Sequence, residues 1–256
     1  MEYTDILYEK KDGIAKITIN RPDKFNAFRA RTWNEMQDAL ISAGRDNEVG
    51  VVILTGAGKK AFCTGGDVSA RTDTGYDEHF NLPGPAYMLR TIPKVTIAMV
   101  NGFAVGGGHV FHVNADLTIA SENARFGQVG PKYGSYDPGW GSAYLARLVG
   151  QKKAREIWFL CRQYNPQEAL DMGLINFVFP AETLEEETYK ICREILQLSP
   201  SALKTLKASF NADVEQIAGI QELAAISLFQ YYSGDESKEG TNAFLEKRLP
   251  DYSKWR

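Results

Sequence analysis

Two short glycine-rich segments hold the residues best suited to chemistry in this chain of 256 residues. One runs from Cys63 to Asp67 (CTGGD), and the other runs from Gly106 to His109 (GGGH). Because glycine has no Cβ, backbone N–H groups in such loops can approach a ligand closely. Two N–H groups that converge on one oxygen form an oxyanion hole, which stabilises the negative charge that develops in acyl chemistry. Taken singly, each loop is as typical of close helix packing or a tight turn as of an oxyanion hole.

A third segment, Gly134 to Gly141 (GSYDPGWG), adds a carboxylate to this set. Asp137 is a candidate acid or base, and Ser135 is a candidate to hold or orient it. Serine, aspartate, proline and glycine also form turns, so composition alone favours a turn here.

His109 and His112 lie three residues apart in a predicted helix, a spacing that two metal ligands can share. No carboxylate or cysteine at a suitable spacing completes the set of ligands that zinc requires. We therefore expect two buried structural histidines and no metal.

Apolar runs that end just before the loops predict the elements that position them. The predicted strands are Ile14–Asn20, Val51–Thr55, Val95–Val100 and Asp116–Ala120, and a predicted helix covers Thr32–Gly44. The run VVILT is continuously apolar, as in a strand that is buried on both faces. The repeated order of strand, loop and helix predicts an α/β architecture, in which sites lie at the carboxyl ends of strands.

The chain changes character after Ser199, where the strand signals stop. Helical spacing covers Pro200–Ala212, Val214–Tyr232 and Lys238–Arg248. We therefore expect a core over residues 1–199 that holds the active site and a helical region over residues 200–256. This C-terminal region is expected to pack on its own core or on a neighbouring subunit, and to complete the site.

The composition argues against several classes of protein. The net charge is −3 and 44% of the residues are hydrophobic, which is typical of a globular chain. Such a chain offers no broad basic face for nucleic acid. No apolar run reaches the roughly 18 residues that a membrane span needs, and the polar start MEYTDILYEKKDG does not resemble a signal peptide. The three cysteines are widely spaced, which is typical of free thiols in a reducing compartment. We therefore expect a cytoplasmic protein.

Five stretches of the chain together resemble the crotonase (enoyl-CoA hydratase/isomerase) superfamily. They are ITINRPDKFNAF, VVILTGAGKKAFCTGGD, PKVTIAMVNGFAVGGG, DLTIASENARFGQ and ALDMGLINFVFP. The resemblance implies a spiral core of ββα units and acyl-CoA thioester substrates. It also implies that the backbone N–H groups of Gly66 and Gly107 form the oxyanion hole. Homotrimers or homohexamers, with no cofactor beyond the CoA of the substrate, are implied as well.

The two glutamates that hydratases of this superfamily use are missing. By resemblance the first would stand at Val110 and the second at Gly130. Neither valine nor glycine transfers a proton, so the sequence argues against hydration of a double bond.

The stretches GQVGPKYGSYDPGWGSAYLAR and VGQKKAREIWFLCRQY resemble one branch of the superfamily. That branch contains 1,4-dihydroxy-2-naphthoyl-CoA synthase, which closes a ring, and 2-ketocyclohexanecarboxyl-CoA hydrolase, which opens one. The resemblance implies that Ser135 and Asp137 work with a tyrosine of the C-terminal helices. This tyrosine is Tyr232, with Tyr231 one residue away as the alternative.

Further positions are implied to bind the substrate. The resemblance places Ala27, Arg29 and Val68 near CoA, and Asp67 either orients the first loop or caps a helix. Arg71, which follows this loop, is a cation that the synthase also has. Arg29 and Lys247 either bind phosphates or are solvated charges. In the synthase, bicarbonate serves as a base, and its implied pocket here consists of Gln128, Gly130 and Trp158.

The direction of the reaction rests on local features. FCTGGD, FGQVGPK, SYDPGWG and YYSGDESKEG are more similar to the hydrolase, whereas REIWFLCRQYNPQEALDMGL and FNADVEQIAGIQELA are equally similar to the synthase. The segment Val68–Arg71 lacks a lysine of the synthase, which weakens binding of a second substrate carboxylate. We therefore predict hydrolytic ring opening, with ring closure as the alternative. A non-catalytic acyl-CoA binding protein is the third possibility.

Overall fold

The computed structural model describes residues 2–72, 75–76 and 84–256, with residues 71, 72, 75 and 76 described by their backbone only. In these residues the larger sheet has six strands in the order β1-β2-β3-β7-β9-β11. They are β1 (Ile6–Lys11), β2 (Ile14–Ile19), β3 (Val51–Gly56), β7 (Val95–Val100), β9 (Leu117–Ser121) and β11 (Phe177–Phe179). Only the β1–β2 pair of this sheet is antiparallel. The predicted strands and the α/β architecture are therefore confirmed.

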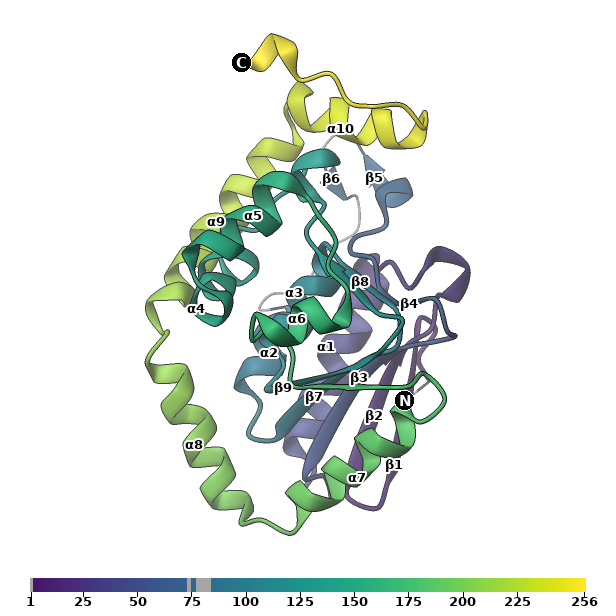
Figure 1. The fold of residues 1–256 in the computed structure, drawn as a ribbon, viewed down its shortest axis with the longest axis vertical. Helices are drawn as coiled ribbons and strands as arrows, with labels where there is room; N and C mark the ends of the chain where they lie inside the picture. The colour runs from purple at the N-terminus through teal and green to yellow at the C-terminus, as the bar shows by residue number, and fades with distance from the viewer. Residues whose placement is uncertain (1, 73–74, 77–83) are drawn as a thin grey trace.

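Helices cover both faces of this sheet (Figure 1). The helices are α1 (Ala30–Arg45), α2 (Pro85–Thr91), α3 (Gly107–Asn114), α4 (Leu145–Val149), α5 (Gln151–Leu160), α6 (Pro166–Asp171), α7 (Leu184–Leu196), α8 (Pro200–Ala212), α9 (Gln216–Tyr232) and α10 (Asp235–Leu245). Val52 and Leu54 of β3 face the core beneath α1 to α3, and Val51 and Ile53 face a second core beneath α7. This alternation explains why β3 is apolar at every one of these positions.

A second sheet carries the glycine loops. Its three described strands have the order β10-β8-β4, namely β10 (Arg125–Gly127), β8 (Phe103–Val105) and β4 (Ala61–Cys63), and all pairs are parallel. Cys63 pairs with Ala104, so β4 and β8 end at the same edge. The two loops therefore leave the sheet side by side. A short antiparallel pair, β5 (Arg71–Thr72) and β6 (Gly75–Tyr76), follows the first loop.

The C-terminal region is helical, as expected. Helix α8 has the predicted bounds, α9 begins two residues later than predicted, and α10 begins three residues earlier, at Asp235. Figure 1 shows α8 and α9 following one another along one side of the molecule, with α10 at the far end. Among the described residues beyond Ser199 there is no strand.

No helix in the described ranges combines the length and apolar composition needed to cross a lipid bilayer.

Candidate active site

The two glycine loops touch one another. A Cβ built on Gly65, whose φ is +92°, would lie 2.9 Å from the backbone nitrogen of Gly107. A Cβ on Gly108 would run into the backbone of Cys63. Both positions therefore require glycine, and this close approach brings the two loops together.

Each loop has a backbone N–H group that is open. The Phe28 N–H donates to the Gly65 carbonyl and the Asp67 N–H donates to the Phe28 carbonyl, both at 2.8 Å, so the intervening Gly66 N–H faces away from Phe28. Gly107 is the first residue of α3, where an N–H group has no acceptor within the helix. Among the described residues neither N–H group donates a hydrogen bond. Adjoining loops with two open donors are the arrangement that an oxyanion hole needs.

An ion pair holds the first loop. The Arg21 guanidinium donates to the Asp67 carboxylate at 2.9 Å and also to the Ala27 carbonyl. Ser69 donates to the other Asp67 oxygen from its N–H at 3.1 Å and its hydroxyl at 2.6 Å. Burial works to raise the pKa of Asp67, but the hydrogen bonds from Ser69 and Arg21 and the charge of Arg21 hold it below its usual value. Asp67 thus both orients the loop and caps the short turn that follows.

The Asp137 carboxylate is held on one side and open on the other. The N–H groups of Gly139 and Gly141 both donate to its Oδ1 at 3.0 Å. Within the described part of the chain its Oδ2 accepts no hydrogen bond. Burial of the carboxyl group raises the pKa of Asp137, although the two N–H donors oppose the rise. An oriented carboxylate with a raised pKa is a stronger proton acceptor than one at its usual pKa.

Asp137 lies beside Val110, the position at which the resemblance places the first glutamate of a hydratase. A Cβ built on Gly141 would lie 2.8 Å from the Asp137 Cβ and 3.0 Å from the Val110 Cγ2, so these two side chains meet over Gly141. Val110 belongs to α3, which begins with the second glycine loop. The structure therefore brings Asp137 to the helix that carries Gly107.

The space beside Gly130, where the resemblance places the second glutamate of a hydratase, is occupied by other atoms. A Cβ built on Gly130 would lie 2.6 Å from the Ser135 carbonyl oxygen and 3.2 Å from the Trp158 ring. The indole N–H of Trp158 is buried and donates to the Gly141 carbonyl at 2.7 Å. No side chain fits at position 130 unless the segment that carries Ser135 and Asp137 moves.

Tyr232, and not Tyr231, reaches Ser135. The Tyr232 hydroxyl lies 2.8 Å from the Ser135 Oγ, and only 9% of this tyrosine is exposed. The Tyr231 ring packs instead on Tyr136, with ring centroids 5.0 Å apart. Ser135 and Tyr232 are 97 positions apart, so the contact depends on where α9 packs.

The C-terminal helices hold the rest of this segment. Gln221 of α9 accepts a hydrogen bond from the Trp140 N–H at 2.8 Å. Ser237 of α10 donates to the Gly134 carbonyl at 2.8 Å. Helices α9 and α10 of the same chain therefore fix both ends of the segment that carries Asp137.

The residues that the resemblance implies for substrate binding lie in different parts of the structure. The Arg29 guanidinium binds both oxygens of Asp5 at 2.8 and 2.9 Å, and Lys247 is exposed after the end of α10. Ala27 is buried and Val68 is partly exposed, both next to the first glycine loop. The side chain of Arg71 lies outside the described atoms. The structure does not bring Arg29 or Lys247 to Asp137 by any contact among the described residues.

The implied bicarbonate pocket has one buried side-chain donor that lacks a partner among the described residues. Gln128 is 1% exposed, and its buried Nε2 has no partner among the described residues. The Trp158 N–H is already engaged, and the space beside Gly130 is occupied. One side-chain donor does not make a complete anion site, so these three residues do not fit bicarbonate.

The two histidines of α3 bind each other. His112 Nε2 lies 3.0 Å from His109 Nδ1, and both rings are buried. Burial lowers the pKa of His109 to about 4 and that of His112 well below its usual value, so both rings are neutral at pH 7. No group of three metal-ligating side chains occurs in the ranges that the structure describes.

Three side chains that support the site were not singled out from the sequence. Arg21 stands in the family-like stretch ITINRPDKFNAF, which was a usable signal. Gln221 and the buried Arg90 stand in helical stretches with no local signal, because their partners are distant in sequence.

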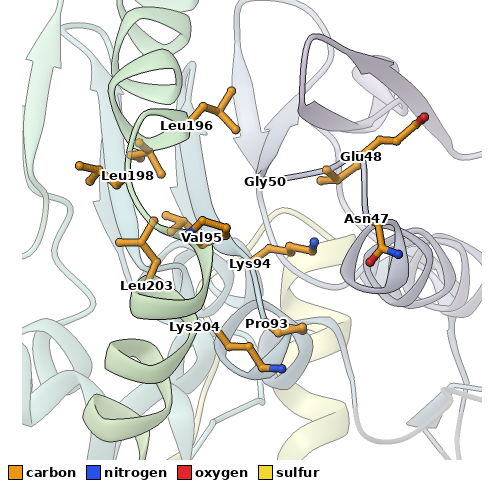
Figure 2. Close-up of a pocket in the computed structure, with 13 residues that line it drawn as sticks. Asn47, Glu48, Gly50, Pro93, Lys94, Val95, Leu196, Leu198, Leu203 and Lys204 are labelled. Carbon is orange, nitrogen blue, oxygen red and sulfur yellow. The ribbon is translucent and has the colours of Figure 1, made fainter.

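A surface pocket lies away from these residues. It has a volume of about 240 Å³ and contains Lys94 and Lys204, with Leu196 and Leu203 opposite Glu48 (Figure 2). The pocket borders the amino ends of β3 and β7, whereas the glycine loops follow the carboxyl ends of β4 and β8. It is therefore separate from the candidate active site.

Comparisons with known proteins bear on this arrangement. The sequence profile described as enoyl-CoA hydratase/isomerase matches residues 9–255. A carnitinyl-CoA hydratase from Mycobacterium avium is 32% identical with a TM-score of 0.88, over 98% of each chain. An enoyl-CoA hydratase from Mycobacterium avium subsp. paratuberculosis K-10 is 26% identical with a TM-score of 0.87, over 98% of this chain and 100% of the other. A methylmalonyl-CoA decarboxylase in complex with 2-nitronate-propionyl-CoA is 26% identical with a TM-score of 0.83, over 98% and 99%. These similar proteins are named for different reactions, so the likeness alone does not select one.

Proposed function

This chain belongs to the enoyl-CoA hydratase/isomerase family of the crotonase superfamily, and on that premise we propose that it opens the ring of a cyclic β-ketoacyl-CoA with water. The crotonase fold expected from the sequence is confirmed by this membership. The chain is accordingly an enzyme that acts on acyl-CoA thioesters. The substrate class we propose is represented by 2-ketocyclohexanecarboxyl-CoA.

The position of Asp137 carries the proposal. The carboxylate meets Val110 where a hydratase has its first glutamate, and Gly130 leaves no room for the second. One carboxylate against the helix that begins with Gly107, together with the two open N–H groups of the glycine loops, suits an enolate reaction that needs a single base. It does not suit hydration, which uses a pair of glutamates.

The first step activates water. Asp137 accepts a proton from water through its open Oδ2, and the water oxygen attacks the ring ketone carbon. The bond between this carbon and the thioester α-carbon then breaks. The electron pair of that bond forms the thioester enolate, whose oxygen accepts hydrogen bonds from the N–H groups of Gly66 and Gly107.

The second step returns a proton to carbon. The α-carbon of the enolate is protonated through the Ser135 and Tyr232 hydroxyl pair, which Asp137 resupplies with the proton taken from water. The former ketone carbon ends as a carboxylic acid. The reaction consumes one water and leaves the thioester bond intact.

A mass-spectrometric assay with two thioesters tests this function. With 2-ketocyclohexanecarboxyl-CoA we expect the acyl-CoA mass to increase by one water. With o-succinylbenzoyl-CoA, a loss of one water would instead indicate the ring-closing reaction of 1,4-dihydroxy-2-naphthoyl-CoA synthase. No mass change with either thioester contradicts the proposal.

We also propose that the enzyme is a homotrimer or homohexamer. Large apolar side chains of α8 and α9 are exposed, including Phe210 at 73%, Leu223 at 70% and Ile226 at 60%. A monomer rarely exposes so many large apolar side chains on two consecutive helices to water. A second copy of the chain is the occupant that family membership favours.

A further inference from the structure

Arg90, in the last turn of α2, is a buried cation. Only 5% of the residue is exposed, and within the described residues no carboxylate lies within ion-pair distance of its guanidinium. Burying a charge is costly unless other contacts stabilise it. The partners of Arg90 should therefore reveal what the residue does.

Two aromatic rings flank the guanidinium. Its central carbon lies 4.7 Å from the centroid of the Trp140 ring and 4.1 Å from that of the Tyr144 ring. At such distances a guanidinium is attracted to the face of an aromatic ring, and the attraction strengthens away from water. Arg90 thus connects two side chains of a single turn.

Trp140 and Tyr144 are the first and last residues of a π-helical turn. Such turns are rare and occur often at functional sites. The Gly139 carbonyl accepts from the N–H groups of both Ala143 and Tyr144, at 2.9 and 3.3 Å. The start of this turn also supplies the Gly139 and Gly141 N–H groups that bind the Asp137 carboxylate.

Asn211 of α8 fixes the orientation of Arg90. Its Oδ1 accepts from the guanidinium at 2.8 Å, and its Nδ2 donates to the Arg90 carbonyl at 2.7 Å. A planar guanidinium held by a hydrogen bond keeps a defined orientation against the rings, which a flexible ammonium would not.

We propose that Arg90 is a positioning residue, which packs against the rings of Trp140 and Tyr144 so that the π-helical turn presents two N–H groups to Asp137. Only the catalytic consequence rests on the proposed function. The contact between Arg90 and the turn is independent of which reaction the enzyme performs.

Hydrogen exchange tests the contact without substrate. In Arg90→Met the backbone N–H groups of residues 139–144 should exchange at least about tenfold faster than in the wild type. Arg90→Lys keeps the positive charge beside the rings and should fall between the two. The control is Leu40→Ala, which destabilises the core in α1, far from the turn in sequence, and should not accelerate exchange there selectively.

Kinetics with 2-ketocyclohexanecarboxyl-CoA test the consequence. We expect kcat to fall about tenfold in Arg90→Met, to recover partly in Arg90→Lys, and KM to change less than twofold. Exchange in residues 139–144 that is unchanged, or equally accelerated by Leu40→Ala, overturns the proposal. Faster exchange with an unchanged kcat overturns the positioning role. A wild-type enzyme that is inactive on this thioester contradicts the proposed function, and the exchange result then decides the Arg90 contact by itself.

Discussion

Asp137 has one carboxylate oxygen bound to the backbone and one oxygen left open. The two N–H donors on Oδ1 fix the direction of the carboxyl group, and burial raises its pKa. Both properties suit a base, because its lone pair must point at the proton and a raised pKa makes the carboxylate a stronger proton acceptor.

Replacing Asp137 with asparagine separates catalysis from binding. The amide side chain in Asp137→Asn keeps an oxygen that can accept from Gly139 and Gly141, so the fold and the affinity for acyl-CoA should persist. Without a base, kcat should fall about 10²- to 10⁴-fold. Turnover and acyl-CoA affinity are measured together, with Asp171→Asn in α6 as a surface control. Unchanged turnover in Asp137→Asn would exclude Asp137 as the base, whereas a wild type that binds acyl-CoA without turnover would support a protein that only binds it.

Tyr231 and Tyr232 form a matched pair for the next prediction. Tyr232→Phe removes the hydroxyl that meets Ser135, and kcat should fall about tenfold, the rate equivalent of one hydrogen bond of about 1.4 kcal/mol. Tyr231→Phe keeps the ring that packs on Tyr136 and should leave kcat unchanged. Steady-state kinetics on the two variants check this, and the reverse ranking would exclude the proposed role of Tyr232.

Helix α3 connects the second glycine loop to the core. It begins at Gly107, presents Val110 towards Asp137 and buries His109 and His112 on another side. Because the pKa of His109 is lowered to about 4, this ring stays neutral in the folded protein while it gains a proton in the unfolded chain below pH 6.5.

The stability of the protein should therefore decrease on acidification between pH 6.5 and about 4. In this window the unfolded state binds more protons, so the free energy of unfolding falls by up to about 1.4 kcal/mol per pH unit for each such histidine. His109→Gln should lose less stability between pH 7 and pH 5 than the wild type. Urea unfolding at both pH values measures this, and equal losses in the two proteins would argue against the histidine as the cause.

Local signals in the sequence predict the helices and strands, but not which residues of different helices and strands come into contact. The apolar run of β3 and the Ser199–Pro200 start of α8 define their elements directly, since the Ser199 hydroxyl caps α8. Helix α10 begins earlier than its apolar spacing predicts, because Asp235 and Glu236 suit a first helical turn.

The sequence also indicates only part of the candidate site. The glycine loops, Ser135 and Asp137 are recognisable from motifs. The choice of Tyr232 over Tyr231 and the Arg90 contact depend on the packing of α8 and α9, which local sequence does not encode.

At the scale of the whole molecule, the C-terminal helices have two surfaces. One surface holds the segment around Asp137 through Gln221 and Tyr232, and the other exposes large apolar side chains. Figure 1 shows α8 and α9 along the outside of the molecule, where a second copy can reach them.

Leu223→Glu should dissociate the oligomer. The side chain is 70% exposed in the single chain, so a charge there should not disturb the folded subunit but should oppose burial against a neighbour. Light scattering after size-exclusion chromatography should show the wild type as a trimer or hexamer and the variant as a smaller species. An oligomer of unchanged size in the variant, or a monomeric wild type, would contradict an interface on this face.

Isotope labelling tests the enolate mechanism most directly. The wild-type enzyme is incubated with 2-ketocyclohexanecarboxyl-CoA in water enriched in deuterium and ¹⁸O, and the product is examined by mass spectrometry. The mechanism predicts at least one solvent deuterium on the carbon next to the thioester, one ¹⁸O in the distal carboxylate and an intact CoA ester. Release of free CoA with ¹⁸O at the former thioester carbon would show simple thioester hydrolysis and contradict the mechanism.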